Sequence, residues 1–225
     1  METTEPQNTE PVTTEPVTDA PLFGEPLPVE LMNTVWADRD GVHDALLDAD
    51  GLARWLVSVR PRLPVGPAAG GDAAAVDDAP SPALLGEFRQ LRDALRRLAA
   101  VATDDTRPAA SSATPDLTAA VDAVNHACAY APAWSRLDWP EGGAPTRTGH
   151  SAHSRAATAL SGIAEEATRL FTGDARSELR ACHAPGCVLY FVRSHPRREW
   201  CSAACGNRAR VARHYQRHHA GSAPR

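Results

Sequence analysis

The chain has 225 residues, a net charge of −5 and 43% hydrophobic residues. This length suits one ordinary domain with a small module beside it, and the hydrophobic content is enough to bury a core. No uninterrupted apolar run is long enough for a membrane span, and the acidic, polar N-terminus is unlike a signal or transit peptide. We therefore expect a cytoplasmic protein with no membrane partner.

Charge is distributed unevenly along the chain. Residues 176–225 contain ten arginines and only two acidic residues, a net charge of +8, whereas residues 1–175 carry a net charge of −13. Every basic residue is Arg, a usage typical of GC-rich bacterial genomes. A basic C-terminal segment on an acidic body indicates a polyanion as partner.

The first 21 residues repeat Thr-Glu-Pro at a spacing of five residues. Such an acidic, proline-rich repeat cannot form a packed core, so we expect 1–21 to be disordered, and likewise the short end 221–225. Between these ends the sequence predicts two folded parts, a helical body over 22–175 and a cysteine-rich module over 176–220.

The body is predicted to be mainly α-helical. Apolar residues recur at helical spacing in the segments 52–59, 81–102 and 151–173. Ser81-Pro82 is a typical helix start, because serine caps the first turn and proline fits there without its missing N–H. The residues between the first two of these helices, 64–82, favour a loop.

Two further elements are expected in the body. Thr114-Pro115 predicts the start of a helix, whose buried face would carry Leu117, Val121, Val124 and a free thiol at Cys128. Large apolar residues before the turn-forming segment 140–143 favour a short β-hairpin within 130–150: they are Trp134, Leu137 and Trp139. No nucleophile elbow, phosphate-binding glycine loop or HExxH sequence occurs, so the sequence predicts no enzyme.

Four of the five cysteines fall within 24 residues, in the spacing Cys-x4-Cys-x13-Cys-x3-Cys. They are Cys182, Cys187, Cys201 and Cys205. Two such pairs are typical of a structural zinc site, where four thiolates surround one Zn²⁺ and leave no position open. Disulfides are disfavoured in a chain without a secretion signal. We therefore predict one structural zinc ion.

The thirteen residues between the two cysteine pairs fit a hairpin. We expect Val188–Val192 as one strand, a turn at 194–196, and Arg197–Trp200 as the returning strand. The second pair would then open a helix, with Cys205 in the first turn, where the helix dipole stabilises a thiolate. Knuckle, hairpin and helix together resemble the treble-clef arrangement.

The helix that follows Cys201 carries an arginine-rich face. On a helical wheel one face, expected to dock on the module, carries Ala204, Arg208, Val211, Ala212 and Tyr215. The opposite face carries Arg210, Arg213 and Arg217, which we call the Arg face; Arg197 and Arg198 of the hairpin would extend it.

Arginine forks suit phosphate groups, and residues 200–225 contain no carboxylate to compensate them. We therefore favour a nucleic-acid contact over a plain solvated face. DNA is the preferred partner, because no aromatic pair suggests the base stacking typical of RNA recognition. The negative charge of the body predicts that the module projects from it.

The tetrapeptide Cys205-Gly206-Asn207-Arg208, with the four spaced cysteines and the Arg-rich helix, resembles the bacterial CGNR zinc fingers. That finger usually follows an ABATE domain, described as a stress-induced transcription regulator. Residues 24–34 are similar to the opening motif of that domain, which ends in Asn33-Thr34. Pro28 interrupts the apolar run of the motif, and Glu30 stands where we expect Asp. The resemblance covers about residues 22–220.

The resemblance implies a transcription regulator whose finger contacts DNA and whose body senses a small-molecule effector or forms a homodimer. Within the signature we expect structural roles for Gly206 and Arg208, with Arg208 bonded to backbone carbonyls of the hairpin. The alternative for Arg208 is to read guanine, and Asn207 either reads adenine or holds the finger together. In the body, Asn33 and Thr34 are candidate ligand or motif residues.

An alternative belongs to a different class of function. The finger would then be a structural or protein-interaction module on a body that binds a small molecule, because treble-clef modules serve both uses. Reversing the charge of the Arg face separates the two hypotheses. The first predicts that the wild-type protein binds DNA and that the reversal abolishes this binding, whereas the second predicts no DNA binding in the wild type.

Overall fold

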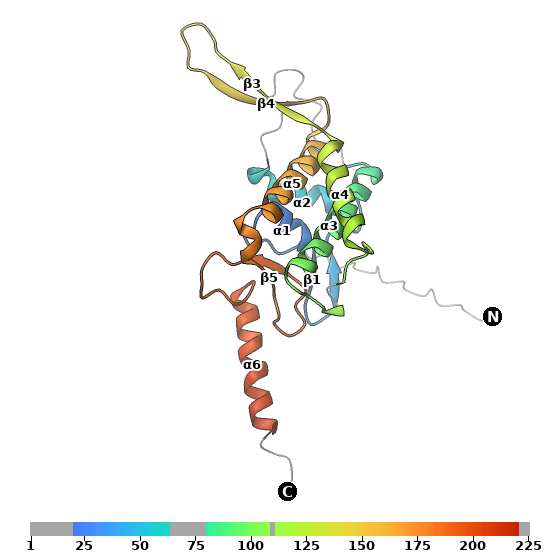
Figure 1. Cartoon of the computed structure of the whole chain (residues 1–225), viewed down its shortest axis with the longest axis vertical. Helices are drawn as coiled ribbons and strands as arrows, with labels where there is room; N and C mark the ends of the chain where they lie inside the picture. Colours follow the sequence, from blue (N-terminus) through green and yellow to red (C-terminus); the bar gives the residue numbers. More distant parts are fainter. Residues whose placement is uncertain (1–19, 64–79, 109–110, 221–225) are drawn as a thin grey trace, which may run out of the picture.

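The structure is a computed structural model that describes residues 20–63, 80–108 and 111–220 (Figure 1), with side chains as far as Arg217. The predicted disorder of 1–21 and 221–225 therefore lies outside the described residues, apart from Ala20 and Pro21. Most of the predicted loop 64–82 lies outside them as well.

The described elements of the body are mainly helices, as predicted. They are α1 (Leu27–Met32), α2 (Ala49–Val59), α3 (Pro82–Ala102), α4 (Leu117–Tyr130) and α5 (Arg155–Thr172). Short 3-10 turns follow α2 and α5: η1 (Arg60–Arg62) and η3 (Asp174–Glu178). The last helix of the chain is α6 (Ala203–Ala220).

The strands form antiparallel pairs. In the body β1 (Val35–Ala37) pairs with β2 (Val42–Asp44), and β3 (Ala133–Asp138) pairs with β4 (Thr146–Ser151). In the cysteine-rich module β5 (Leu179–Ala181) pairs with β6 (Tyr190–Val192).

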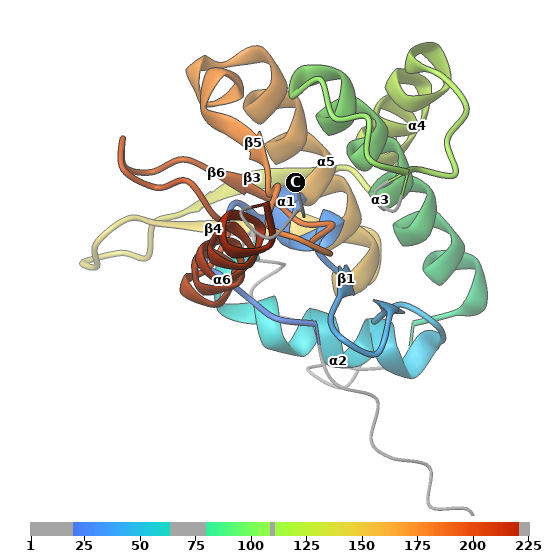
Figure 2. The ribbon, with the colours of Figure 1, turned by 90° about the horizontal axis from the view of Figure 1, so that it is seen from below.

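The core lies among α1, α3, α4 and α5. Helix α3 packs against α4, α4 packs against α5, and α1 contacts both α3 and α5 (Figure 2). Helix α3 begins as predicted, because the Ser81 hydroxyl accepts the N–H of Leu84 at 3.2 Å. Phe88 and Leu160 are among the residues that this packing buries completely.

The opening motif forms α1 and the turn before it. Pro28 lies in the first turn of α1, where proline is tolerated. The buried Glu30 carboxylate accepts the N–H groups of Phe23 (3.2 Å) and Glu25 (2.8 Å) and an N–H of Arg62 (3.2 Å). This acid therefore has specific partners inside the body, where it fixes the chain entering α1.

The buried face of α4 differs from the predicted one. The helix is capped by Asp116 rather than begun at Thr114-Pro115, and its buried residues are Ala120, Ala123, Val124 and Ala127. Leu117, Val121 and Cys128 are wholly or partly exposed. Helix α4 packs against both α3 and α5 through three alanines and Val124, which was predicted on this face, while Leu117 and Val121 face outward.

The predicted hairpin is confirmed as β3–β4, which we call the arm. It extends from the end of the molecule opposite to α6 (Figure 1). Its large apolar residues stay exposed, Trp134 to 56%, Leu137 to 67% and Trp139 to 68%.

Helix α6 projects from the other end of the molecule (Figure 1), and its buried residues lie in its first turns. Cys205, Gly206 and Ala209 are buried there, whereas Val211 and Tyr215 are exposed. The predicted docked face of this helix was therefore wrong. The packed face is centred about 120° away, on the side that carries the cysteine.

Nowhere in the described parts of the chain is a helix both long and apolar enough to cross a membrane.

Burial, rather than residue type, should decide the cost of truncating a leucine in this body. We expect Leu160→Ala to lower the free energy of unfolding by about 2–5 kcal/mol, because it leaves a cavity between packed helices. Leu117→Ala, at a half-exposed position, should cost less than about 1 kcal/mol. Urea unfolding of both variants measures the difference, and equal losses would contradict the burial assigned to α4.

Candidate metal centre and body–finger junction

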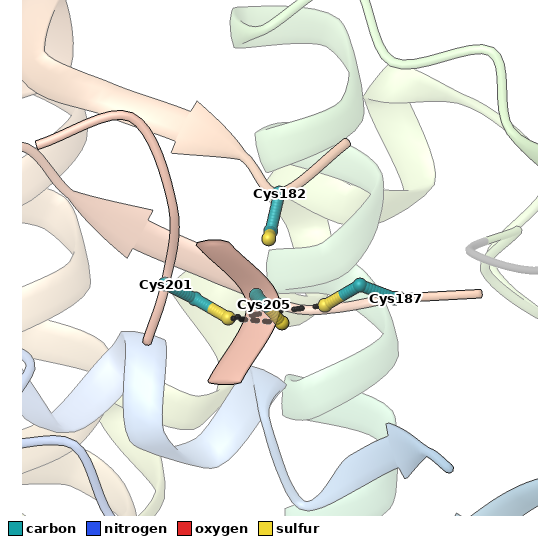
Figure 3. A group of neighbouring side chains, drawn as sticks. All are labelled: Cys182, Cys187, Cys201 and Cys205. Carbon is teal, nitrogen blue, oxygen red and sulfur yellow. Dashed lines mark hydrogen bonds between the residues drawn. The ribbon is translucent and has the colours of Figure 1, made fainter. Parts of the chain in front are cut away.

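The four clustered cysteines come together at one point of the cysteine-rich module (Figure 3). Their Sγ atoms all lie within 4.8 Å of one another, and all four residues are buried. Cys201 and Cys205 have Sγ atoms 3.4 Å apart, and Cys187 and Cys201 have them 3.8 Å apart. Four sulfurs placed tetrahedrally at a Zn–S distance of about 2.3 Å would be separated by about 3.8 Å. The cluster therefore fits one zinc ion.

Local backbone structure places each sulfur. The N–H of Cys187 bonds to the carbonyl of Ala184 at 2.9 Å, closing a tight turn in which Gly186 has a φ of +73°. Only glycine adopts that conformation without strain. The Ser202 hydroxyl accepts the N–H of Cys205 at 3.2 Å, as a helix-capping residue does. The first pair thus lies on a knuckle, and the second pair spans the start of α6.

Crowding makes the four thiols unequal, because hydrogen bonds within the cluster lower the pKa values of Cys182 and Cys205 and raise those of Cys187 and Cys201. Hydrogen bonds from Cys187 and Cys201 lower the pKa of Cys182 to about 7. Those from Cys182, Cys187 and Cys201 hold the pKa of Cys205 well below its usual range. A zinc ion requires all four cysteines as thiolates, and the buried cluster already stabilises charge on two of them.

The antiparallel strand pair of the finger is present, but its partners differ from the predicted ones. Strand β6 (Tyr190–Val192) pairs with β5 (Leu179–Ala181), which precedes the first cysteine pair. Residues 197–200 were expected to return as a strand, but they form none: a turn at 195–198 is closed by the N–H of Arg198 and the carbonyl of His195 at 2.9 Å, and the chain to Trp200 is irregular. The knuckle therefore lies at the tip of the strand pair.

Arg208 contacts the cysteine cluster directly. Its Nη2 lies 3.0 Å from the Sγ of Cys205, so its expected structural role is met through a cysteine sulfur rather than through backbone carbonyls. Gly206 is buried against Trp200, where an added Cβ would lie 3.2 Å from the ring. These two signature residues pack the first turns of α6 onto the cluster.

Arg107 of the body bonds to the knuckle. Its Nη1 donates to the carbonyl oxygens of Cys182 (2.5 Å) and Cys187 (2.7 Å). Asp105 holds the guanidinium with two contacts of 2.7 Å and accepts the hydroxyl of Tyr190 at 2.8 Å. Burial alone would raise the pKa of Asp105, but the bonds from Arg107 and Tyr190 outweigh it and lower the pKa to about 2. The stabilisation of the folded state by these two bonds is therefore present at neutral pH and is lost as Asp105 protonates in strong acid.

Asn33 joins the body to strand β6. Its Nδ2 donates to the carbonyl of Tyr190 at 2.9 Å, and its Oδ1 accepts the N–H of Tyr190 at 3.0 Å. Asn33 is fully buried, and its neighbour Thr34 donates to the carbonyl of Leu31 at 2.8 Å. Both candidate ligand residues thus bind protein groups, and we assign Asn33 to the junction and Thr34 to the end of α1.

Two further arginines complete this junction. The buried Arg96 of α3 donates to the carbonyls of Met32 (3.0 Å) and Val188 (3.4 Å). Arg198 donates to the carbonyls of Val192 (3.1 Å) and Cys201 (2.9 Å) and forms an ion pair with buried Glu25. Because these groups occupy its guanidinium, we remove Arg198 from the DNA-contact set.

The expectation that the whole finger projects from the body is therefore wrong. The cysteines share one apolar cluster with Trp36 and Ala45 of the body, and Tyr190 belongs to the main core. Helix α6 beyond its first turns stands clear of the body (Figure 1).

The remaining predicted contact residues lie on the surface. Arg197, Asn207, Arg210, Arg213 and Arg217 are all exposed. The three arginines of the Arg face line one open hollow along α6 together with His214. The Oδ1 of Asn207 accepts a hydrogen bond from Arg210, so Asn207 orients a member of that face.

Several residues of the junction were not predicted from the sequence. No sequence pattern singled out Arg96, Asp105 or Arg107. Their partners are distant in the chain: Arg107 reaches carbonyls 75 and 80 residues further on. The charge of Arg96, in a helix with many arginines, gave no local signal that it would be buried.

The fold and the cysteine cluster define a zinc-finger protein with a helical N-terminal body. Residues 25–174 match the ABATE family, whose description is "Putative stress-induced transcription regulator", and residues 178–218 match the CGNR zinc finger. The chain therefore belongs to the ABATE family and carries a CGNR zinc finger at its C-terminal end. A search among curated proteins found no match.

Zinc binding should depend on pH and on the clustered thiols. Because protons compete with the metal for each thiolate, we expect zinc release to a colorimetric chelator to increase as the pH falls from neutral to mildly acidic. Cys201→Ser should abolish stoichiometric zinc, whereas Cys128→Ser, a cysteine outside the cluster, should retain it. Full zinc content in Cys201→Ser would contradict the four-cysteine site.

The junction should be costly to break at Asn33. We expect Asn33→Ala to lower the free energy of unfolding by about 1–3 kcal/mol, because the mutation removes the Asn33 partners of the buried Tyr190 backbone groups. Asn207→Ala, the same change at an exposed position, should cost less than about 0.5 kcal/mol. Urea unfolding of zinc-loaded protein tests both, and a neutral Asn33→Ala would show that the junction does not depend on this pair.

Proposed function

We propose that this protein is a DNA-binding transcription regulator of the cytoplasm, without catalytic activity, and that α6 contacts the DNA. The observation that carries the proposal is the placement of the Arg face. Arg210, Arg213 and Arg217 are exposed along a helix that stands out from one end of the molecule (Figure 1).

The electrostatics support this placement. No acidic residue follows Glu199, so nothing within α6 neutralises the Arg face, whereas residues 1–175 carry a net charge of −13. Like charges would keep the body away from phosphates and leave the projecting helix to approach them. The 18 residues of α6 span about 27 Å, and the major groove of DNA admits one α-helix.

Zinc has a structural part in this proposal. The cluster and Arg208 fix the first turns of α6 on the finger, and the junction fixes the finger on the body. The Arg face is thereby held in one orientation. Preorganised arginines lose less conformational entropy when they meet phosphates than arginines on a flexible tail would.

A single finger should bind DNA weakly. Arg197 and the Arg face offer about four phosphate contacts, so log affinity should fall with log salt at a slope of about −3 to −4. Useful specificity then requires a homodimer or a second DNA-binding surface. We therefore also propose that the body forms such a homodimer or senses a small effector.

The test is fluorescence anisotropy of zinc-loaded protein with mixed duplex DNA at several salt concentrations. We expect Arg210→Gln, Arg213→Gln and Arg217→Gln together to reduce affinity at least tenfold and the salt slope to about −1, because three phosphate contacts are lost. A matched triple change of exposed body arginines should leave binding unchanged; its members are Arg39→Gln, Arg155→Gln and Arg169→Gln.

No binding by folded, zinc-loaded wild-type protein, even at low salt, would overturn the proposal. Equal losses in the two triple variants would attribute binding to overall charge rather than to α6.

A second candidate function is favoured by one feature of the body. An open hollow of about 660 Å³ lies where α5 ends and β5 begins, lined among others by Phe171, Arg176 and Arg180. Its arginines suit a small anion, and the buried junction suits a finger that serves as a structural clamp. Under this hypothesis Arg176→Gln and Arg180→Gln would abolish effector binding, while the Arg face would be dispensable.

A further inference from the structure

The arm is an isolated two-stranded sheet with apolar side chains in water. Its strands β3 and β4 hold six residues each and extend beyond the helices (Figure 1). Trp134, Leu137 and Trp139 are each more than half exposed. A two-stranded hairpin is marginally stable on its own, and further strands or packing usually complete it. The arm therefore has the features of an incomplete sheet.

The hydrogen bonds within the arm show which backbone groups of β3 face outward. The carbonyl oxygens of Arg136 and Asp138 accept the hydroxyls of Thr148 and Thr146, so they point toward β4. Backbone groups of an antiparallel strand alternate between its two sides. The N–H and C=O groups of Leu137, and of the residues two positions away, therefore point to the open edge of β3.

The charges along β3 are self-complementary. If β3 meets a second copy of itself in antiparallel register centred on Leu137, Arg136 lies opposite Asp138 of the second copy, and Asp138 opposite its Arg136. Ser135 then lies opposite Trp139 of the second copy, and the two Leu137 side chains meet at the twofold axis. Opposite charges across strands stabilise such a pair.

Two further observations favour β3 and a second copy. The arm contains two arginines and two acidic residues, so it is neutral although the rest of the body is acidic, and two arms approach without repulsion. Strand β4, the other edge strand of the arm, instead carries Arg147, Gly149 and His150 with no acidic residue. A second β4 would offer these groups no opposite charge.

We propose that the protein forms a homodimer in which β3 pairs with β3 of a second copy, completing a four-stranded antiparallel sheet. The twofold pairing satisfies the open edge and brings Leu137 and Trp139 of both copies onto one face of the sheet, where they contact across the strands. The proposal names the surface of the dimer, and it is independent of DNA binding, because its tests measure self-association alone.

Cross-linking tests the register. In zinc-loaded protein carrying Cys128→Ser, Leu137→Cys should form a disulfide-linked dimer on mild oxidation, because residues paired by two backbone hydrogen bonds have Cα atoms about 5.5 Å apart, within disulfide reach. The matched control is Arg147→Cys, the register partner of Leu137 on β4. It should stay monomeric on a non-reducing gel. Equal cross-linking of both variants would overturn the register.

Sedimentation velocity tests the charge pairing without cross-links. The wild-type chain should sediment as a concentration-dependent dimer, and Asp138→Arg should abolish the dimer by placing arginines opposite each other. The double variant Arg136→Asp with Asp138→Arg restores opposite charges and should restore the dimer. A monomeric wild type, or a dimer that survives Asp138→Arg, would overturn the proposal, and circular dichroism confirms that each variant is folded.

Discussion

Tyr190 lies where the body meets the zinc finger, and its burial fixes how the two parts fit together. Asn33 pairs with its backbone, Asp105 accepts its hydroxyl, and the guanidinium groups of Arg96 and Arg107 lie within 6 Å of its ring. A buried polar group without a partner is costly, so each of these contacts restricts the position of β6. The knuckle immediately precedes that strand and α6 comes after it in the chain, so the position of β6 constrains both.

The cysteine cluster lies on the other side of the finger, where it holds the start of α6. Cys201 and Cys205 span the start of α6, and Arg208 adds a charged contact to one of their sulfurs. A zinc ion held by these thiolates would couple the first turns of α6 to the knuckle, and the knuckle is bound to the body through Arg107. Folding of the body, binding of the metal and orientation of the Arg face are thus one connected arrangement.

The long axis of the molecule separates two kinds of surface. At one end α6 carries exposed arginines, and at the other the arm carries exposed apolar residues without net charge (Figure 1). The acidic, close-packed body lies between them. A polyanion and a second copy of the chain would therefore approach different ends, so that neither need displace the other.

Features that depend on a few neighbouring residues were determined by the sequence. The cysteine spacing identified the four metal ligands, Ser81 marked the start of α3, and the signature at 205–208 indicated the family. Features that depend on which elements meet were decided by the tertiary structure. Close packing put alanines rather than Leu117 on the buried side of α4. The pairing of β6 with β5 was not predicted from the sequence either. Arg198 likewise pairs with Glu25, which lies 173 residues away in the chain. Burial and long-range pairing are properties of the assembled core, and no local pattern encodes them.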